Sequence, residues 1–265
     1  LECSVMSGEV LGFPFDIYIV GFDDLVIHHP NEIAQNQAHC CTNGLDDAAN
    51  SGARIWMHNN FLGDRSSKES GGKMSKSAGE FLRLQLLIDR GFHPLAYRMM
   101  CLQAHYRSEL EFSWEGLEAA LVRLKRLLTG LRQAQDAWFA EDGGRAIPEP
   151  ATRFDEIAKL VTHPKLTPLL EKFDAALSDD LNTSIALTVL EDLLATKKVP
   201  VDQKAPLALA MTGALGLTLM DREAFRIRPK SATITEAEIE DALARRKAAR
   251  AEKDFATSDA LRDEI

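Results

Sequence analysis

The sequence lacks long apolar runs and contains few cysteines. No run reaches about 18 apolar residues, the length that a membrane-spanning helix requires, so we expect no segment that crosses a membrane. The four cysteines, Cys3, Cys40, Cys41 and Cys101, are irregularly spaced. They give no disulfide framework, which suits a reducing compartment, and we therefore expect a cytoplasmic protein.

A secretory signal and an excess of positive charge are also missing. Leu1 leads directly into Glu2 and Cys3, with neither a basic segment nor an apolar stretch. Because a natural protein starts with Met, we expect that residue 1 is not the true N-terminus. The formal net charge is −9. An acidic chain binds nucleic acid only through local basic patches, so composition alone does not indicate an RNA partner.

The first part of the chain combines strand and helix patterns. Residues 15–20 are β-branched and aromatic and are followed by Gly21, which predicts a buried strand. Pro30 suits the first turn of a helix, where its missing N–H costs nothing, and this helix is expected over Asn31–His39. Residues Ile55–Met57 are a second strand candidate.

The pattern becomes helical further along the chain. Residues 63–80 are rich in glycine, serine and lysine, which predicts a loop. Leucines then recur at helical spacing, most clearly over 117–131. Strands early and helices late predict an α/β unit followed by helical domains. The remaining segments are a linker over 141–150, helices over 153–220, a polar connection over 228–235 and a charged helix over 236–265.

The glycine-flanked loop carries the motif Lys73-Met74-Ser75-Lys76-Ser77. Two lysines three positions apart place two ammonium groups on a flexible arm that can fold over a polyphosphate. Positioned cations stabilise the charge that builds on a leaving pyrophosphate, and glycines let such a loop open and close. The alternative interpretation is a solvated lysine–serine loop without a ligand.

A second constellation combines Cys3 with His28 and Glu32. A thiolate, an imidazole and a carboxylate are all zinc ligands. His28 and Glu32 are four residues apart, so a helix would place them on one face. Taken alone the pattern is also compatible with a surface His–Glu pair and a cysteine that packs as a small hydrophobic residue.

Together these motifs resemble one family. The lysine motif resembles the ATP-binding signature of class I aminoacyl-tRNA synthetases. Glu2-Cys3-Ser4, followed by the segment from His28 to Gln35, resembles the zinc site of the cysteinyl-tRNA synthetases. The resemblance implies one zinc ion per subunit, held by Cys3, His28 and Glu32, with a further family cysteine that belongs to a segment this sequence does not contain.

The resemblance also implies a nucleotide site. Lys76 is expected to contact ATP, which binds with Mg²⁺, and Lys73 to support it. Gly21 and Asp23 keep the family pattern near the adenosine and the ribose. Two departures are present: Tyr18 replaces a histidine near the substrate, and Pro30 replaces a common glutamate. The class I histidine motif of the first half of the nucleotide fold is absent from the sequence.

The implied fold is the second half of a class I nucleotide-binding (Rossmann-like) domain followed by helical tRNA-contacting domains. Downstream, the segment His105-Tyr106-Arg107-Ser108 resembles the family and is interpreted as a packing cluster. Residues 179–183 suit a helix start with Asn182 or Thr183 as the cap. The basic residues of the last helix form either a solvated face or a contact with the tRNA backbone. The expected domains are 1–62, 63–142, 143–230 and 231–265.

The resemblance implies a cysteine–tRNA ligase that uses ATP, L-cysteine and tRNA(Cys) and acts as a monomer. In such an enzyme zinc would bind the substrate thiolate and so distinguish cysteine from serine, which a small pocket separates poorly. Two alternatives remain open. One is the cysteine ligase of mycothiol synthesis, which resembles the same catalytic core, and the other is a non-catalytic tRNA-binding fragment.

Overall fold

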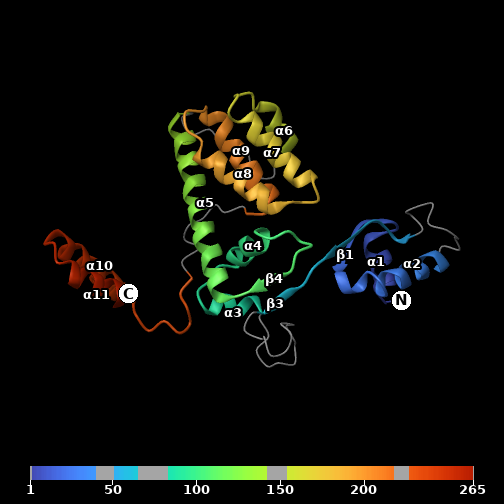
Figure 1. The fold of residues 1–265 in the computed structure, drawn as a ribbon, viewed down its shortest axis with the longest axis horizontal. Coiled ribbons are helices and arrows are strands. Elements are labelled where there is room, and N and C mark those ends of the chain that lie inside the picture. Colours follow the sequence, from blue (N-terminus) through green and yellow to red (C-terminus); the bar gives the residue numbers. More distant parts are fainter. Residues whose placement is uncertain (1, 40–50, 65–82, 142–153, 218–226, 265) are drawn as a thin grey trace.

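The computed structural model describes residues 2–39, 51–64, 83–141, 154–217 and 227–264 (Figure 1). Within these ranges no helix is both long and apolar enough to cross a membrane. Helices α1 and α2, with strand β1, lie at one end of the molecule, helices α4 to α9 lie in the middle, and α10 and α11 lie at the other end. The first elements are α1 (Glu2–Leu11), β1 (Phe15–Gly21), η1 (Phe22–Asp24), α2 (His28–His39), β2 (Ala53–Asn59) and β3 (Leu62–Asp64).

Strands β1 and β2 pair in parallel, with η1 and α2 between them in the sequence. The register sets Tyr18 beside Trp56 and Val20 beside His58. Both predicted strands are confirmed, and β2 extends beyond Ile55–Met57 at both ends. Helix α2 begins at His28, earlier than predicted, with Pro30 in its first turn, where backbone N–H groups have no partner within the helix.

The expectation that 15–20 is a buried strand is wrong for most of its side chains. Phe15 is buried, but Ile17 is 49% and Ile19 57% exposed. Among the described residues, β2 is the strand that pairs with β1, and nothing covers these two side chains. Composition reports that a strand is apolar, whereas burial depends on what packs against it.

The middle of the molecule is helical, as predicted. Its elements are α3 (Leu84–Asp89), α4 (Pro94–Leu102), β4 (Leu110–Phe112), α5 (Trp114–Glu141), α6 (Phe154–Leu160), α7 (Thr167–Ser178), α8 (Thr183–Ala195) and α9 (Val201–Ala214). The leucine stripe of α5 faces one shared core, in which Leu117, Leu124 and Leu127 are almost completely buried. Leu190 and Met211 reach the same core from α8 and α9. Burial of these side chains is the main stabilising contribution to the helical part.

A short parallel pair, β3 with β4, was not predicted. Residues 63 and 64 therefore belong to a strand and not to the expected loop, whose remainder, 65–80, lies outside the described residues. Next to this pair the Asn60 N–H donates to the Tyr106 carbonyl at 2.8 Å, and the Asn60 side chain donates to the Arg107 carbonyl at 3.0 Å. These bonds join the end of β2 to the loop between α4 and β4.

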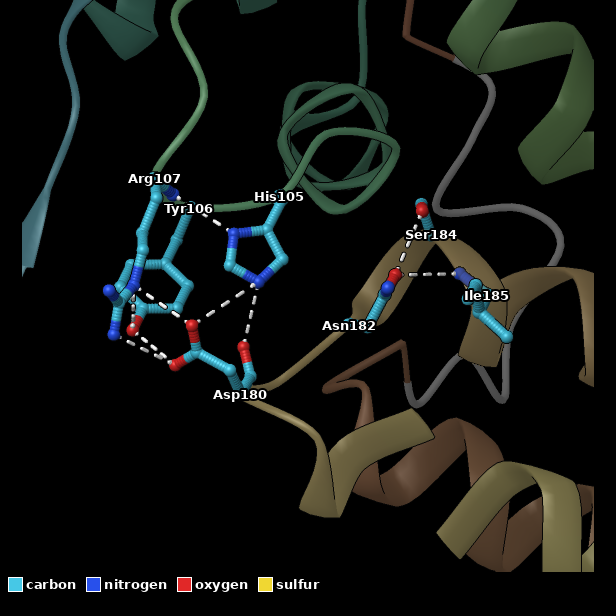
Figure 2. A network of polar contacts seen from close by, with 7 residues as sticks. All are labelled: His105, Tyr106, Arg107, Asp180, Asn182, Ser184 and Ile185. Atoms are coloured by element: carbon cyan, nitrogen blue, oxygen red, sulfur yellow. Dashed lines mark hydrogen bonds and ion pairs between the residues drawn. The ribbon is translucent and has the colours of Figure 1, made fainter. Parts of the chain in front are cut away.

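The same loop is joined to the turn between α7 and α8 (Figure 2). The Tyr106 hydroxyl donates to Asp180 Oδ1 at 2.6 Å, Arg107 Nε lies 2.9 Å from Asp180 Oδ2, and His105 Nε2 lies 2.9 Å from the Asp180 carbonyl. We call these four residues the Asp180 clasp. Asn182 then caps α8, because its side chain accepts from the Ile185 N–H, which confirms the predicted helix start.

The charged C-terminal segment forms two helices, α10 (Glu236–Ala251) and α11 (Phe255–Glu264), and the prediction of one helix over 236–265 is wrong. Helix α10 stops at the cap residue Glu252, and Lys253 has a positive φ of 61°. The Asp254 carboxylate then accepts from the Thr257 N–H at 3.1 Å, as a helix N-cap does. The break is local and lets the two helices pack against each other.

Candidate metal and nucleotide site

Three side chains singled out in the sequence meet where α1 and α2 begin. Cys3 comes from the first turn of α1, and His28 and Glu32 lie one turn apart on α2. One donor atom of each residue lies within 4.8 Å of the other two, and His28 Nε2 lies 3.3 Å from Glu32 Oε1. The helical spacing of four residues accounts for the His–Glu pair, and the packing of α1 on α2 adds the thiol.

The three donors differ in exposure. The Cys3 thiol is exposed and the His28 side chain is 46% exposed, whereas the Glu32 side chain is 5% exposed. An ion or substrate can therefore approach from the side of Cys3 and His28. The carboxylate forms the floor of the site, where water is largely excluded.

The buried carboxylate is held by Tyr18 of β1. The Tyr18 hydroxyl donates to Glu32 Oε1 at 2.8 Å. Burial is the largest cause that raises the pKa of Tyr18 above its ordinary value, and the hydrogen bond to the Glu32 carboxylate and its charge add to the rise. The phenol therefore stays protonated and keeps its donor at neutral pH.

Aromatic rings surround this contact. Tyr18 lies 4.8 Å from Trp56 and 5.0 Å from His29, measured between ring centroids. His29 is buried, its Nδ1 lies 2.7 Å from His58 Nε2, and burial lowers the pKa of His29. No local pattern indicated that Trp56 and His58 lie at this site, because the register of β2 on β1 brings them here.

The residues present fit a metal ion. Glu32 Oε2 is buried and has no hydrogen-bond partner among the described residues. A buried carboxylate oxygen without a donor is unfavourable, and a cation supplies the missing interaction. One sulfur, one imidazole nitrogen and one carboxylate oxygen are a donor set typical of zinc.

Gly21 and Asp23 lie at the carboxyl end of β1, next to the end of β2. In parallel sheets ligands bind beyond this end of the strands. A Cβ added at Gly21 would lie 2.6 Å from Asp23 Oδ1, so the close approach of the Asp23 carboxylate depends on the glycine. Asp23 is exposed and free to accept hydrogen bonds from a ligand. The other two predicted residues, Lys73 and Lys76, lie outside the described residues.

Comparison with known proteins adds an independent observation. Residues 1–122 match the family model described as tRNA synthetases class I (C) catalytic domain. The whole chain is 66% identical to the cysteine–tRNA ligase of Novosphingobium aromaticivorans and 44% identical to that of Zymomonas mobilis, covering 50% and 52% of those proteins. It is 39% identical to cysteine–tRNA ligase 1 of Burkholderia lata, of which it covers 47%.

The chain thus spans about half the length of the curated relatives it matches. The similarity extends along all of the chain and is not confined to the part that the catalytic-domain model matches. The chain is thus similar along its whole length to cysteine–tRNA ligases, and residues 1–122 are similar to the catalytic domain of class I tRNA synthetases.

Proposed function

We propose that this chain is part of an enzyme that activates L-cysteine with ATP and transfers it to tRNA(Cys). The observation that carries the proposal is the meeting of Cys3, His28 and Glu32 around a buried carboxylate oxygen that has no partner among the described residues. The named activity of the relatives, cysteine–tRNA ligase, agrees with this chemistry. In this proposal β1, α2 and β2 are the second half of a Rossmann-like domain.

The three ligands have distinct roles in the proposed site. Glu32 holds the ion from the buried side, while Cys3 and His28 hold it from the side that faces solvent. A bound zinc ion would take the sulfur of cysteine as a thiolate, a bond that the harder hydroxyl of serine does not match. Cysteine and serine differ too little in size for a pocket to separate them, so the selection of cysteine over serine needs an interaction with the sulfur itself.

ATP would bind with Mg²⁺ beyond the carboxyl ends of β1 and β2. Asp23, which follows the end of β1, would accept hydrogen bonds from the ribose, and Gly21 leaves room for that carboxylate. On the sequence motif alone, Lys73 and Lys76 would stabilise the pyrophosphate as it leaves. The cysteine carboxylate would attack the α-phosphate, and the tRNA 3′-end would then take the cysteinyl group.

The helical part would bind and orient the tRNA. Helix α10 carries Arg245, Arg246, Lys247 and Arg250, which supply local positive charge in an otherwise acidic chain. Such charge is what a contact with the nucleic-acid backbone requires. We assign tRNA contacts to the segments 63–142, 143–230 and 231–265 and expect the enzyme to act as a monomer.

The test is cysteine-dependent exchange of pyrophosphate into ATP by the complete gene product. We expect exchange with cysteine, much less with serine, and about 100-fold or greater loss in Cys3→Ala, since loss of a ligand exceeds loss of a group that supports one. Cys101→Ala is the matched control, because Cys101 is a free thiol on α4, outside the site.

Absence of cysteine-dependent exchange would refute the proposed activity. If exchange is present, offering the activated enzyme either tRNA or an amino-sugar acceptor distinguishes the synthetase from the related cysteine ligase. Tight tRNA binding without exchange would instead favour a non-catalytic tRNA-binding role.

A further inference from the structure

The Tyr18 side chain is held by neighbouring rings so that its hydroxyl faces Glu32. It lies in the middle of β1, and its ring is held by Phe15 at 5.6 Å, Trp56 at 4.8 Å and His29 at 5.0 Å between centroids. A ring packed on several sides has little freedom to rotate. The hydroxyl is therefore presented to Glu32 from a fixed direction.

The two oxygens of Glu32 have different environments. Oε1 accepts from the Tyr18 hydroxyl at 2.8 Å and lies 3.3 Å from His28 Nε2. Oε2 is buried and has no hydrogen-bond partner among the described residues. The phenol thus fixes the rotation of the carboxylate and leaves one oxygen for a further bond.

We propose that Tyr18 is a positioning residue for the metal site, acting through its hydrogen bond to the ligand Glu32. This inference rests on the proposed metal site of Cys3, His28 and Glu32. Residues that orient metal ligands from outside the coordination sphere are usually carboxylates, carbonyls or waters that accept from histidine. Here the supporting group is the phenol of Tyr18 on strand β1, which donates to the carboxylate of Glu32 on helix α2.

The hydroxyl of Tyr18 orients Glu32 because the Glu32 carboxylate is buried and has few other hydrogen-bond donors among the described residues. Without the phenol, both carboxylate oxygens would lack a hydrogen-bond donor from β1, and the side chain would be free to turn away from Cys3 and His28. Ordering it again on metal binding would then cost conformational entropy, which lowers the affinity. The hydroxyl therefore prepares the site before the ion arrives.

The test measures zinc affinity of the complete gene product by competition with a chromophoric chelator, in wild type, Tyr18→Phe and Tyr97→Phe. Tyr18→Phe removes one oxygen and keeps the ring. We expect a 10- to 100-fold weaker zinc affinity, the range typical of lost support for a metal ligand. Tyr97→Phe is the matched control, because Tyr97 lies on α4 and its hydroxyl bonds with Cys101. Melting curves followed by circular dichroism check that both variants fold.

A second measurement separates positioning from a general effect on the fold. In a Glu32→Ala background the hydroxyl has no carboxylate to hold, so adding Tyr18→Phe should leave the remaining cobalt affinity unchanged. The absorption bands of bound Co²⁺, which report ligand geometry, should shift in Tyr18→Phe alone.

Three results would contradict the inference in distinguishable ways. Equal zinc affinity of wild type and Tyr18→Phe overturns the role of Tyr18 and leaves the metal site standing. A loss that persists in the Glu32→Ala background also overturns it, since the effect would not pass through Glu32. A wild-type protein that binds no zinc removes the metal site itself, and the inference with it.

Discussion

Glu32 is the most deeply buried of the three residues of the candidate site, and its carboxylate is only partly paired. A carboxylate that is almost completely buried requires compensation, and the described residues supply it to only one of its oxygens, through Tyr18 and His28. Burial of such a group without full pairing is unfavourable and is found mostly where function needs it. The cost would be recovered when a cation binds.

At the same scale, Gly21 controls where Asp23 can lie. We predict that Gly21→Ala displaces the Asp23 carboxylate, because the new Cβ would come within 2.6 Å of Oδ1. If Asp23 bonds to the nucleotide, the KM for ATP should rise about 10- to 100-fold, the value of one hydrogen bond to a charged group. Pyrophosphate exchange at varied ATP measures this change.

Asp16→Asn is the control for Gly21→Ala. Asp16 lies near the opposite end of the same strand, its side chain is 91% exposed, and Arg54 is its neighbour. Its KM for ATP should equal that of wild type. An unchanged KM in Gly21→Ala would show that Asp23 does not contact the nucleotide.

At the scale of elements, the Asp180 clasp joins segments about 75 residues apart. Asp180 and Leu181 both have positive φ, at 54° and 56°, which non-glycine residues rarely adopt. The turn between α7 and α8 is therefore held in an unfavourable backbone conformation. Tyr106 and Arg107 hold it from the α4–β4 loop.

We predict that Asp180→Asn loosens this turn. Asparagine tolerates positive φ, so the substitution removes the charge and spares the backbone. Amide hydrogen exchange over residues 179–183 should become faster. The effect on overall stability should be small, because the ion pair is exposed to solvent. Asp192→Asn, at an exposed position of α8, is the control and should exchange as wild type does.

The same variant has a defined pH dependence. The Tyr106 hydroxyl and the Arg107 guanidinium lower the pKa of the Asp180 carboxyl below its ordinary value. The contribution of the carboxylate is therefore complete above the unfolded-state pKa of about 3.9 and is lost as the pH falls through the lower folded-state value. The protection of residues 179–183 from amide hydrogen exchange should differ between wild type and Asp180→Asn at pH 7, and the two proteins should become equal in acid. A constant difference would contradict this assignment.

At the scale of the whole molecule, stability resides in the helical core. Helices α5, α8 and α9 share one buried cluster, whereas the part with β1 and β2 exposes several large apolar side chains. The end of β2 is tied to the helical part through Asn60 and the loop that carries Tyr106 and Arg107. The candidate site thus lies at one end of the molecule, and the helical core lies in the middle.

We predict that Leu190→Ala lowers the free energy of unfolding of the helical part by about 2–5 kcal/mol, because Leu190 is fully buried in α8 and its removal leaves a cavity. Chemical unfolding followed by circular dichroism measures the loss. Leu243→Ala, at a position of α10 that is 48% exposed, should change it by less than about 0.5 kcal/mol. Equal effects of the two substitutions would contradict the assignment of this core.

Local patterns predicted much of this structure. The leucine stripe of 117–131 predicted α5, the β-branched and aromatic residues of 15–20 predicted β1, and Asn182 or Thr183 was predicted as the cap of α8. Each depends on residues within a few positions of one another, where helical or strand periodicity operates. The pair β3–β4 was missed because strands of three residues have no readable period.

Local sequence patterns predict most of the helices, the two long strands and the pairing of His28 with Glu32, because backbone preference and i, i+4 spacing are local properties. The positions of Cys3 beside them, of Tyr18 against Glu32 and of Asp180 against Arg107 depend instead on the three-dimensional packing. These contacts connect residues 14 to about 75 positions apart. They arise from strand register and helix packing, which no short stretch of sequence encodes.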